Sequence, residues 1–212
     1  DYDRSLATDF DIVMAEEQFG SAVMEWEALP QHLELIIKGY PHTESSLQAR
    51  IAFYPVEDYY RVNPNIGDSH ANLQQMLMMR RTDDLPDPLP FFPFWDAGQV
   101  IAVKVAYLDF ANGSGVRYLT QYASDVYPVN NMGLFYTFQG LTDDGKTLVS
   151  AVMPVSNPIL PDPQIILADP AFYDGYETYL SVVTADLMEQ PDDSYTPDLA
   201  LLDALFESLL VE

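Results

Sequence analysis

Two hairpin patterns within residues 99–154 constrain the fold more than any other part of the sequence. Residues 100–110 are rich in β-branched and aromatic side chains, which is typical of a strand in a half-buried sheet. The segment 111–115 contains Asn112 and two glycines, and these residue types tolerate the positive φ angles of tight turns. Residues 116–122 alternate again, so the sequence predicts a first hairpin with its loop at residues 111–115.

A second hairpin is predicted soon after the first. Residues 134–140 and 147–154 form its arms, and the loop between them contains Asp144-Gly145, a strong short-range hairpin signal. Because short connections favour antiparallel neighbours, the four strands are expected to be antiparallel neighbours in one sheet. Large apolar side chains occur on both faces, so helices are expected to cover at least one face.

Two further strands are predicted at residues 31–40 and 47–54. In each segment apolar side chains recur at every second position, which is the period of a half-buried strand. We expect these strands to pair with each other and to extend the central sheet. Residues 10–14 indicate one short strand in a lead-in segment.

Helical patterns lie on both sides of the four central strands. A short helix is predicted at residues 55–60, because proline is favoured in a first turn. A longer helix is predicted at residues 68–81, with Asp68 or Ser69 as its N-cap.

The C-terminal part of the sequence predicts two more helices. Residues 171–189 carry apolar side chains at helical spacing. Thr196 as N-cap, followed by Pro197 at the first helical position, predicts the start of the last helix. The elements together predict a single α+β domain over residues 1–212, with an antiparallel sheet of about six strands flanked by helices in an α/β/α-like sandwich.

Residues 85–93 form a proline-rich segment before the first central strand. Its four prolines exclude a helix interior and a central strand. We interpret it as an extended strap whose aromatic side chains are buried against the sheet, namely Phe91, Phe92, Phe94 and Trp95. The alternative is an exposed aromatic patch that binds a partner.

The chain is strongly acidic. Of its 212 residues 33 are Asp or Glu and 9 are Lys or Arg, so the formal net charge is −24. Such a field repels nucleic acid and anionic membranes, and neither is expected as a main partner. The charge is typical of a soluble protein. A partner with a basic patch, or loosely bound divalent cations, are the alternatives.

The absence of cysteine and of long apolar runs limits the chemistry and the membrane insertion that are possible for this chain. It contains no cysteine, so disulfides and thiolate chemistry are excluded. No apolar run reaches about 18 residues, and no transmembrane segment is predicted. Because the sequence begins with Asp1 and not with methionine, a signal peptide or a lipid anchor upstream is compatible with it.

No catalytic or cofactor motif is recognisable. His32, His42 and His70 lie far apart in the sequence and lack the spacing of a zinc site. Nucleotide-binding glycine motifs are absent, so no cofactor is expected. The acidic residues are scattered, and a calcium loop near residues 169–177 lacks the alternating ligands of an EF-hand. A pair of acids for glycoside hydrolysis would have to be gathered by the fold.

Polar side chains are dense in the central strands and form the candidate ligand site. Arg117 stands out because positive charge is scarce in this chain. We expect it either to pair with Asp109 on the neighbouring strand or to hold an anionic group of a ligand. The other candidate ligand-binding residues share this stretch, and they are Tyr107, Asp109, Tyr118, Gln121, Tyr136 and Gln139.

Three segments resemble a family of bacterial exported proteins of unknown function, often predicted lipoproteins, from Chloroflexi-like bacteria. These segments are residues 51–56, 105–122 and 134–142, and the resemblance is most specific at residues 107–122. It implies an extracytoplasmic location and supplies no activity. The order of the elements is similar to that of PsbP-type sandwiches, which tend to serve as accessory or binding modules, although fold alone does not settle function.

These observations favour a non-enzymatic extracytoplasmic module that binds an unknown protein or small molecule. The alternative is a hydrolase that acts on cell-wall glycan or peptide through carboxylates gathered by the fold. Two facing carboxyl groups with perturbed pKa values in a cleft would favour the hydrolase. A third hypothesis is a calcium-dependent structure.

Overall fold

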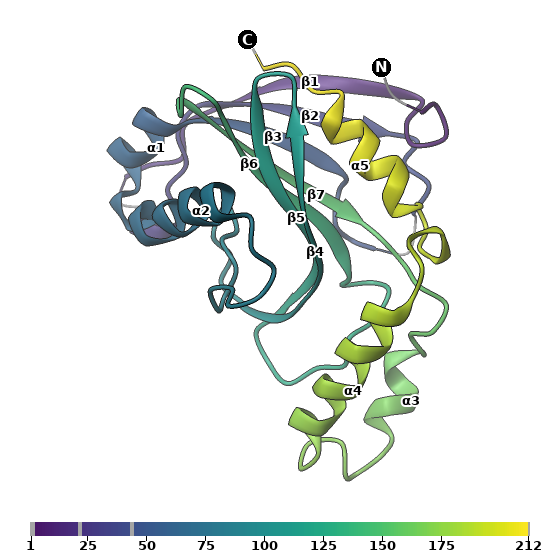
Figure 1. Cartoon of the computed structure of the whole chain (residues 1–212). Helices are drawn as coiled ribbons and strands as arrows, with labels where there is room; N and C mark the ends of the chain where they lie inside the picture. The colour runs from purple at the N-terminus through teal and green to yellow at the C-terminus, as the bar shows by residue number, and fades with distance from the viewer. Residues whose placement is uncertain (1–2, 21–22, 43–44, 212) are drawn as a thin grey trace.

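The computed structural model describes residues 3–20, 23–42 and 45–211. Its centre is an antiparallel sheet of seven strands in the order β1-β2-β3-β7-β6-β5-β4 (Figure 1). The strands are β1 (Asp9–Ala15), β2 (His32–Lys38), β3 (Arg50–Pro55), β4 (Gly98–Phe110), β5 (Gly113–Ala123), β6 (Phe135–Thr142) and β7 (Thr147–Pro154). The predicted α+β class is therefore confirmed.

The predicted number of six strands is wrong, and the seventh strand is β1. This segment was expected only as a short strand in a lead-in. It pairs along its whole length with β2, from Asp9 opposite Lys38 to Ala15 opposite His32. The alternation that marks the other strands is weak in β1, because five of its seven residues are exposed on the edge of the sheet.

Among the described residues, five α-helices accompany the sheet. They are α1 (Val56–Val62), α2 (Gly67–Met79), α3 (Pro163–Leu167), α4 (Tyr176–Glu189) and α5 (Leu199–Glu207). Within the described residues, no helix is both long enough and apolar enough to cross a bilayer.

The two predicted hairpins are confirmed as the β4–β5 and β6–β7 pairs. β5 and β6 are also neighbours, and Gly115 lies opposite Gly140 in their register. A Cβ atom at Gly115 would lie 2.1 Å from Cζ of Phe138, so only glycine leaves room for this ring over the strand. Glycine therefore lets a large aromatic side chain fill the centre of the sheet.

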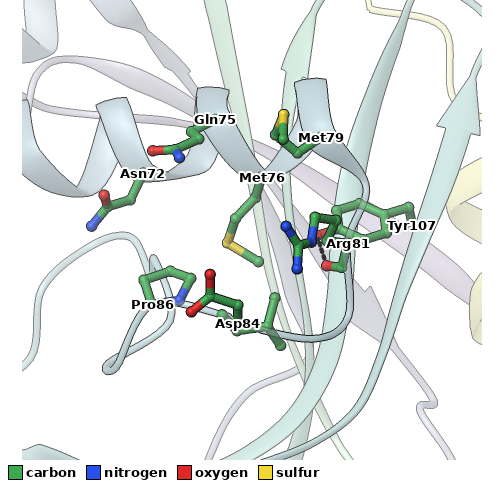
Figure 2. A pocket seen from close by; sticks show the side chains of 9 residues that line it. Asn72, Gln75, Met76, Met79, Arg81, Asp84, Pro86 and Tyr107 are labelled. Atoms are coloured by element: carbon green, nitrogen blue, oxygen red, sulfur yellow. Dashed lines mark hydrogen bonds between the residues drawn. The ribbon is translucent and has the colours of Figure 1, made fainter.

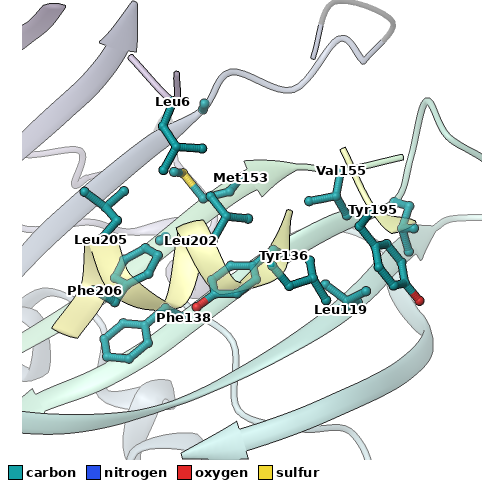
Figure 3. Close-up of a cluster of buried hydrophobic side chains, with 14 of the residues drawn as sticks. Leu6, Leu119, Tyr136, Phe138, Met153, Val155, Tyr195, Leu202, Leu205 and Phe206 are labelled. Carbon is teal, nitrogen blue, oxygen red and sulfur yellow. The ribbon is translucent and has the colours of Figure 1, made fainter. Parts of the chain in front are cut away.

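Helices cover both faces of the sheet (Figure 1). Neighbouring residues of a strand point to opposite faces. Tyr118 belongs to the core under α1 and α2, and Leu119 belongs to the core under α4 and α5. Figure 3 shows this second core, in which Phe206 of α5 stacks on Phe138 with their ring centroids 4.6 Å apart.

The aromatic side chains of the strap pack against the sheet, as predicted, although Phe94 and Trp95 are only half-buried. Phe91 and Phe92 are almost fully enclosed. The backbone of the strap is bonded to side chains of the sheet: the Tyr118 hydroxyl donates to the carbonyl of Pro90 at 2.7 Å, and the Ser150 hydroxyl donates to the carbonyl of Phe92. Because strap and sheet exchange both apolar and polar contacts, the strap is a fixed part of the α1–α2 layer.

Three predicted helix starts are corrected. α2 begins at Gly67 with Ile66 at its N-cap, so neither Asp68 nor Ser69 caps it. α4 begins at Tyr176 and not at residue 171. α5 begins at Leu199, where the side chain of Asp198 accepts a hydrogen bond from the backbone N–H of Ala200 at 2.8 Å. Asp198 is therefore the N-cap in place of Thr196, because its carboxylate satisfies one of the free N–H groups of the first turn.

Candidate functional site

The structure divides the candidate residues predicted from the sequence between the two faces of the sheet. Those that point toward α4 and α5 are Arg117, Gln121 and Tyr136. Those that lie on the side of α2 and the strap are Tyr107, Tyr118 and Gln139, with Asp109 exposed near the end of α2. The predicted set therefore does not form one binding surface.

Arg117 lies in a buried charge network. Its side chain is 7% exposed, and Nη2 lies 3.1 Å from a carboxylate oxygen of Asp203 and 3.5 Å from one of Asp192. Its Nη1 donates to the backbone carbonyl of Lys104, whose own ammonium lies 3.5 Å from Asp192. The guanidinium is thus occupied by groups of the protein.

The expected pairing of Arg117 with Asp109 is wrong. Asp109 forms an ion pair with Arg80, which follows α2. In the β4–β5 register Arg117 lies opposite Ala106, while Asp109 lies opposite Ser114. Arg117 points toward α4 and α5, whereas Asp109 lies on the side of α2, so the sheet itself separates the two side chains.

Asp203 is the acid most strongly affected by burial in this network. Burial raises its pKa, and the neighbouring Arg117 opposes this effect. The hydroxyl of Tyr136 donates a hydrogen bond to Asp203 at 3.0 Å. These bonds tie β5 and β6 to α5, so the network holds the helix on the sheet.

The remaining buried candidates also bind the protein itself. Gln121 accepts a hydrogen bond from the N–H of Asn130 and so holds the loop before β6. Gln139 accepts from the N–H of Phe92 at 3.2 Å and donates to the Ser150 hydroxyl at 2.9 Å. Such fully bonded polar groups specify the packing of the core.

A cavity of about 280 Å³ lies between α2, the loop after it and β4 (Figure 2). Of the candidates predicted from the sequence, it contains Tyr107. Its lining is mixed in character and consists of Asn72, Gln75, Met76, Met79, Arg81, Asp84, Leu85, Pro86 and Tyr107. Figure 2 shows Met76 extending from α2 toward the loop that carries Asp84 and Pro86, with Asn72 and Gln75 beside it on the helix.

The loop beside this cavity has an unusual backbone. Arg80 ends α2 in the left-handed region with φ 50°, and its N–H donates to the carbonyl of Met76 at 2.8 Å. Asp84 also has a positive φ, of 60°. The hydroxyl of Tyr107 donates to the carbonyl of Arg81 at 2.6 Å and so fixes the loop to β4. Residues held in the left-handed region concentrate at ligand-binding sites.

Some polar residues around the cavity bond to one another, and others bond to no protein group that the structure describes. Arg81 donates two hydrogen bonds to Asp83, at 3.1 Å from Nε and 2.8 Å from Nη2, and this lowers the pKa of Asp83. In the described part of the chain, Asp84 has neither a hydrogen bond nor an ion pair. The amides of Asn72 and Gln75 likewise make no hydrogen bond there. All three side chains are exposed, and the charge of Asp84 also acts on Arg81, so they contact solvent and remain accessible to a ligand.

This arrangement is suited to binding a small ligand. The Asp84 carboxylate accepts hydrogen bonds, the two amides both donate and accept, and the buried Met76 supplies an apolar wall. Burial raises the pKa of Tyr107, and its single O–H already donates to the carbonyl of Arg81, so Tyr107 shapes the cavity by holding the loop. Among the described residues, no group of three or more His, Asp or Glu side chains could hold a metal ion.

The sequence reasoning missed four polar residues of this cavity: Asn72, Gln75, Arg81 and Asp84. A signal for two of them was present. Arg80 and Arg81 are the only adjacent basic residues of the acidic chain, and Asp83-Asp84 follow directly. Basic and acidic residues that follow one another at the end of a predicted helix indicate a structured loop. They do not show that this loop lies over β4.

Comparisons of the chain with protein-family models, with curated proteins and with solved structures found no match.

Proposed function

We propose that this protein is a non-enzymatic, extracytoplasmic binding or accessory module whose ligand site is the cavity between α2 and β4. The observation that carries the proposal is the mixed lining of this cavity, in which the exposed polar side chains of Asp84, Asn72 and Gln75 lie beside the buried, apolar Met76. An apolar cavity with a few convergent polar groups is the default hypothesis for a small-molecule site.

The ligand class follows from size and charge. A cavity of about 280 Å³ lies just below the usual range of about 300–1,000 Å³ for ligand sites, so it fits only a small ligand. A cationic group would complement Asp84, and an apolar portion would contact Met76 and Leu85. The bonds from Arg81 to Asp83 use Nε and Nη2, so Nη1 remains for an acidic group of the ligand. These features favour a small amine, including a free amino acid.

The aspartates that the fold brings together are bonded to groups of the protein. This argues for a binding function and against the hydrolase hypothesis. Asp192 and Asp203 approach one another, and both contact the guanidinium of Arg117. A general acid or base must be able to reach a proton of the substrate. Because Asp203 is bound by Arg117 and Tyr136, its role is better explained by attachment of α5 to the sheet.

The extracytoplasmic location is supported by the resemblance described above. The acidic field of the chain disfavours nucleic acid and anionic membrane surfaces as partners. Cell fractionation of the source bacterium tests this location, and recovery of the native protein in the cytoplasm would contradict it.

A thermal-shift screen tests the ligand site. The purified protein is heated with amino acids, other small amines, small anions, divalent cations, glycans and peptides. At about 100 times Kd, a ligand adds about 2.7 kcal/mol to the free energy of unfolding, which raises Tm by about 5–10 °C for a chain of this size. We expect such a rise with an amine.

Two variants of cavity residues and one control variant test whether the rise in Tm comes from binding in the cavity. Asp84→Asn should abolish it, and Gln75→Ala should reduce it. Gln74→Ala changes the neighbouring exposed residue of the same helix, outside the cavity lining, and should leave it intact. A screen without any rise, or a rise that Asp84→Asn leaves unchanged, would contradict the proposed site.

A further inference from the structure

The outer edge of β1 is open. β1 pairs with β2 on one side, and no other described residue pairs with it. Ile12 is 71% exposed and Met14 is 57% exposed, and Val13 between them is also exposed. An edge strand with exposed apolar side chains offers unpaired N–H and C=O groups to another strand.

The opposite edge of the sheet is protected. β4 is interrupted by register shifts between Gln99 and Ile101 and between Val103 and Ala106. The C-terminal helices cover this edge: the N–H of Lys104 lies 3.1 Å from the sulfur of Met188, which belongs to α4. Bulges and covering helices are the usual protection of an edge strand. The fold therefore blocks one edge and leaves β1 accessible.

A trough of about 590 Å³ continues from β1 across the same face of the sheet. Ile12 and Met14 lie opposite Leu35 and Leu33 in the β1–β2 register, so their side chains share this face. The lining of the trough combines the apolar residues Met14, Leu33, Leu35 and Phe53 with the charged residues Glu17, Asp58 and Arg61, and residues 209–211 border it. Side chains of an added strand would have an apolar surface beside them.

The C-terminal border of the trough is held in place by one side chain. Asn112, in the β4–β5 loop, donates to the carbonyl of Val211 at 2.5 Å and accepts from the N–H of Val211 at 3.1 Å. The N–H of Ala111 donates to the carbonyl of Leu209 at 3.0 Å. The trough is therefore a formed feature with a fixed wall.

The other face of β1 is acidic. Asp9 and Asp11 alternate with the apolar residues and point away from the trough. Lys38 lies 2.6 Å from Asp11, and Arg50 of β3, on the same face, pairs with Glu34, so the two aspartates of β1 exceed the positive charge beside them. A strand that alternates apolar and basic side chains would match both faces of β1.

We propose that β1 takes an extended, amphipathic and basic segment of another protein as an eighth strand. Its backbone bonds to the open edge of β1, its apolar side chains cover Ile12 and Met14, and its Lys or Arg side chains lie near Asp9 and Asp11. A second copy of this chain fits less well, because it would bring both pairs of aspartates onto one face and join two molecules of net charge −24.

Fluorescence anisotropy of a labelled, capped peptide of four Lys-Val repeats tests the proposal. We expect saturable binding at low salt that weakens as salt screens the charges. A peptide of the same composition with the four Lys and four Val residues in separate blocks should bind about tenfold more weakly or less. Equal affinity for the two peptides would show attraction of charge alone and would overturn the proposal.

Variants place the peptide on β1. Ile12→Lys puts a charge on the open edge and should weaken binding of the alternating peptide at least about tenfold, while Val182→Lys changes an exposed apolar residue of α4 and should not. Far-UV circular dichroism and Tm confirm that both variants fold. Unchanged affinity of Ile12→Lys would overturn the proposal.

Hydrogen exchange of the backbone amides of β1 tests strand addition directly. Backbone amides on the open edge of β1 should become protected when the Lys-Val peptide binds, and Asp84→Asn should retain this protection because its cavity is separate. Protection confined to other elements would contradict an eighth strand. Self-association that Ile12→Lys abolishes, measured by sedimentation without peptide, would assign the edge to a second copy instead.

Discussion

At the scale of single residues, Arg117 shows how a scarce cation is used in an acidic chain. It is held by carboxylates from the short 3-10 helix Asp192–Ser194 and from α5, and by a backbone carbonyl of β4. Buried ion pairs add little stability compared with apolar residues, but they strongly penalise the loss of one partner. The network therefore determines where α5 lies on the sheet.

Arg117→Met should lower the free energy of unfolding by about 3 kcal/mol, because it leaves the carboxylate of Asp203 buried without its cation. Arg81→Met is the matched control. Arg81 pairs with Asp83 in an exposed position, so its loss should cost less than about 1 kcal/mol. Urea denaturation of both variants measures the difference, and equal losses would contradict a structural role of Arg117.

Asp203 should make stability depend on pH in a specific direction. Its pKa is raised above 3.8 in the folded state, so the folded state binds this proton more tightly than the unfolded state. The stabilisation from this proton is present below pH 3.8 and is lost as pH rises through the raised pKa. Relative to wild type, Asp203→Asn should show a smaller decline in unfolding free energy over that window. A larger decline in the variant would contradict the raised pKa.

At the scale of elements, the hairpins were predictable because their signals are local. Asn112 and Asp144-Gly145 mark tight turns within a few residues of the strands that they join. β1 was underestimated, because its exposed apolar residues blur the alternation that identifies a half-buried strand. The start of α5 was misplaced because Thr196 and Asp198 are both good N-caps, and the choice depends on the path of the preceding chain.

Packing of β5 on β6 leads to a prediction at this scale. Gly115→Ala would place a methyl group 2.1 Å from Cζ of Phe138, and should cost about 1–3 kcal/mol through displacement of the ring. At Gly98 the nearest atom to an added Cβ would be the carbonyl oxygen of Ala123 at 3.8 Å. Gly98→Ala should therefore be tolerated. Thermal unfolding of the two variants compares them, and similar Tm values would contradict the close approach.

At the scale of the whole molecule, the candidate site is assembled from parts that no local pattern connects. α2, the loop after it and β4 together line the cavity, and Tyr107 lies 23 positions after Asp84 in the numbering. The sequence identified Tyr107 as a polar residue of a strand but could not place the loop above it. For the same reason Arg117 was assigned to Asp109 on the next strand, although its partner Asp203 lies 86 residues away.

The most direct test of the proposed function is a ¹H–¹⁵N NMR titration of the protein with a mixture of the proteinogenic L-amino acids. The proposal predicts that perturbed amides concentrate at residues 72–86 and at Tyr107, and that Asp84→Asn removes these changes. Perturbations confined to other parts of the fold, or a spectrum that the mixture leaves unchanged, would contradict the cavity between α2 and β4 as a site for small amines.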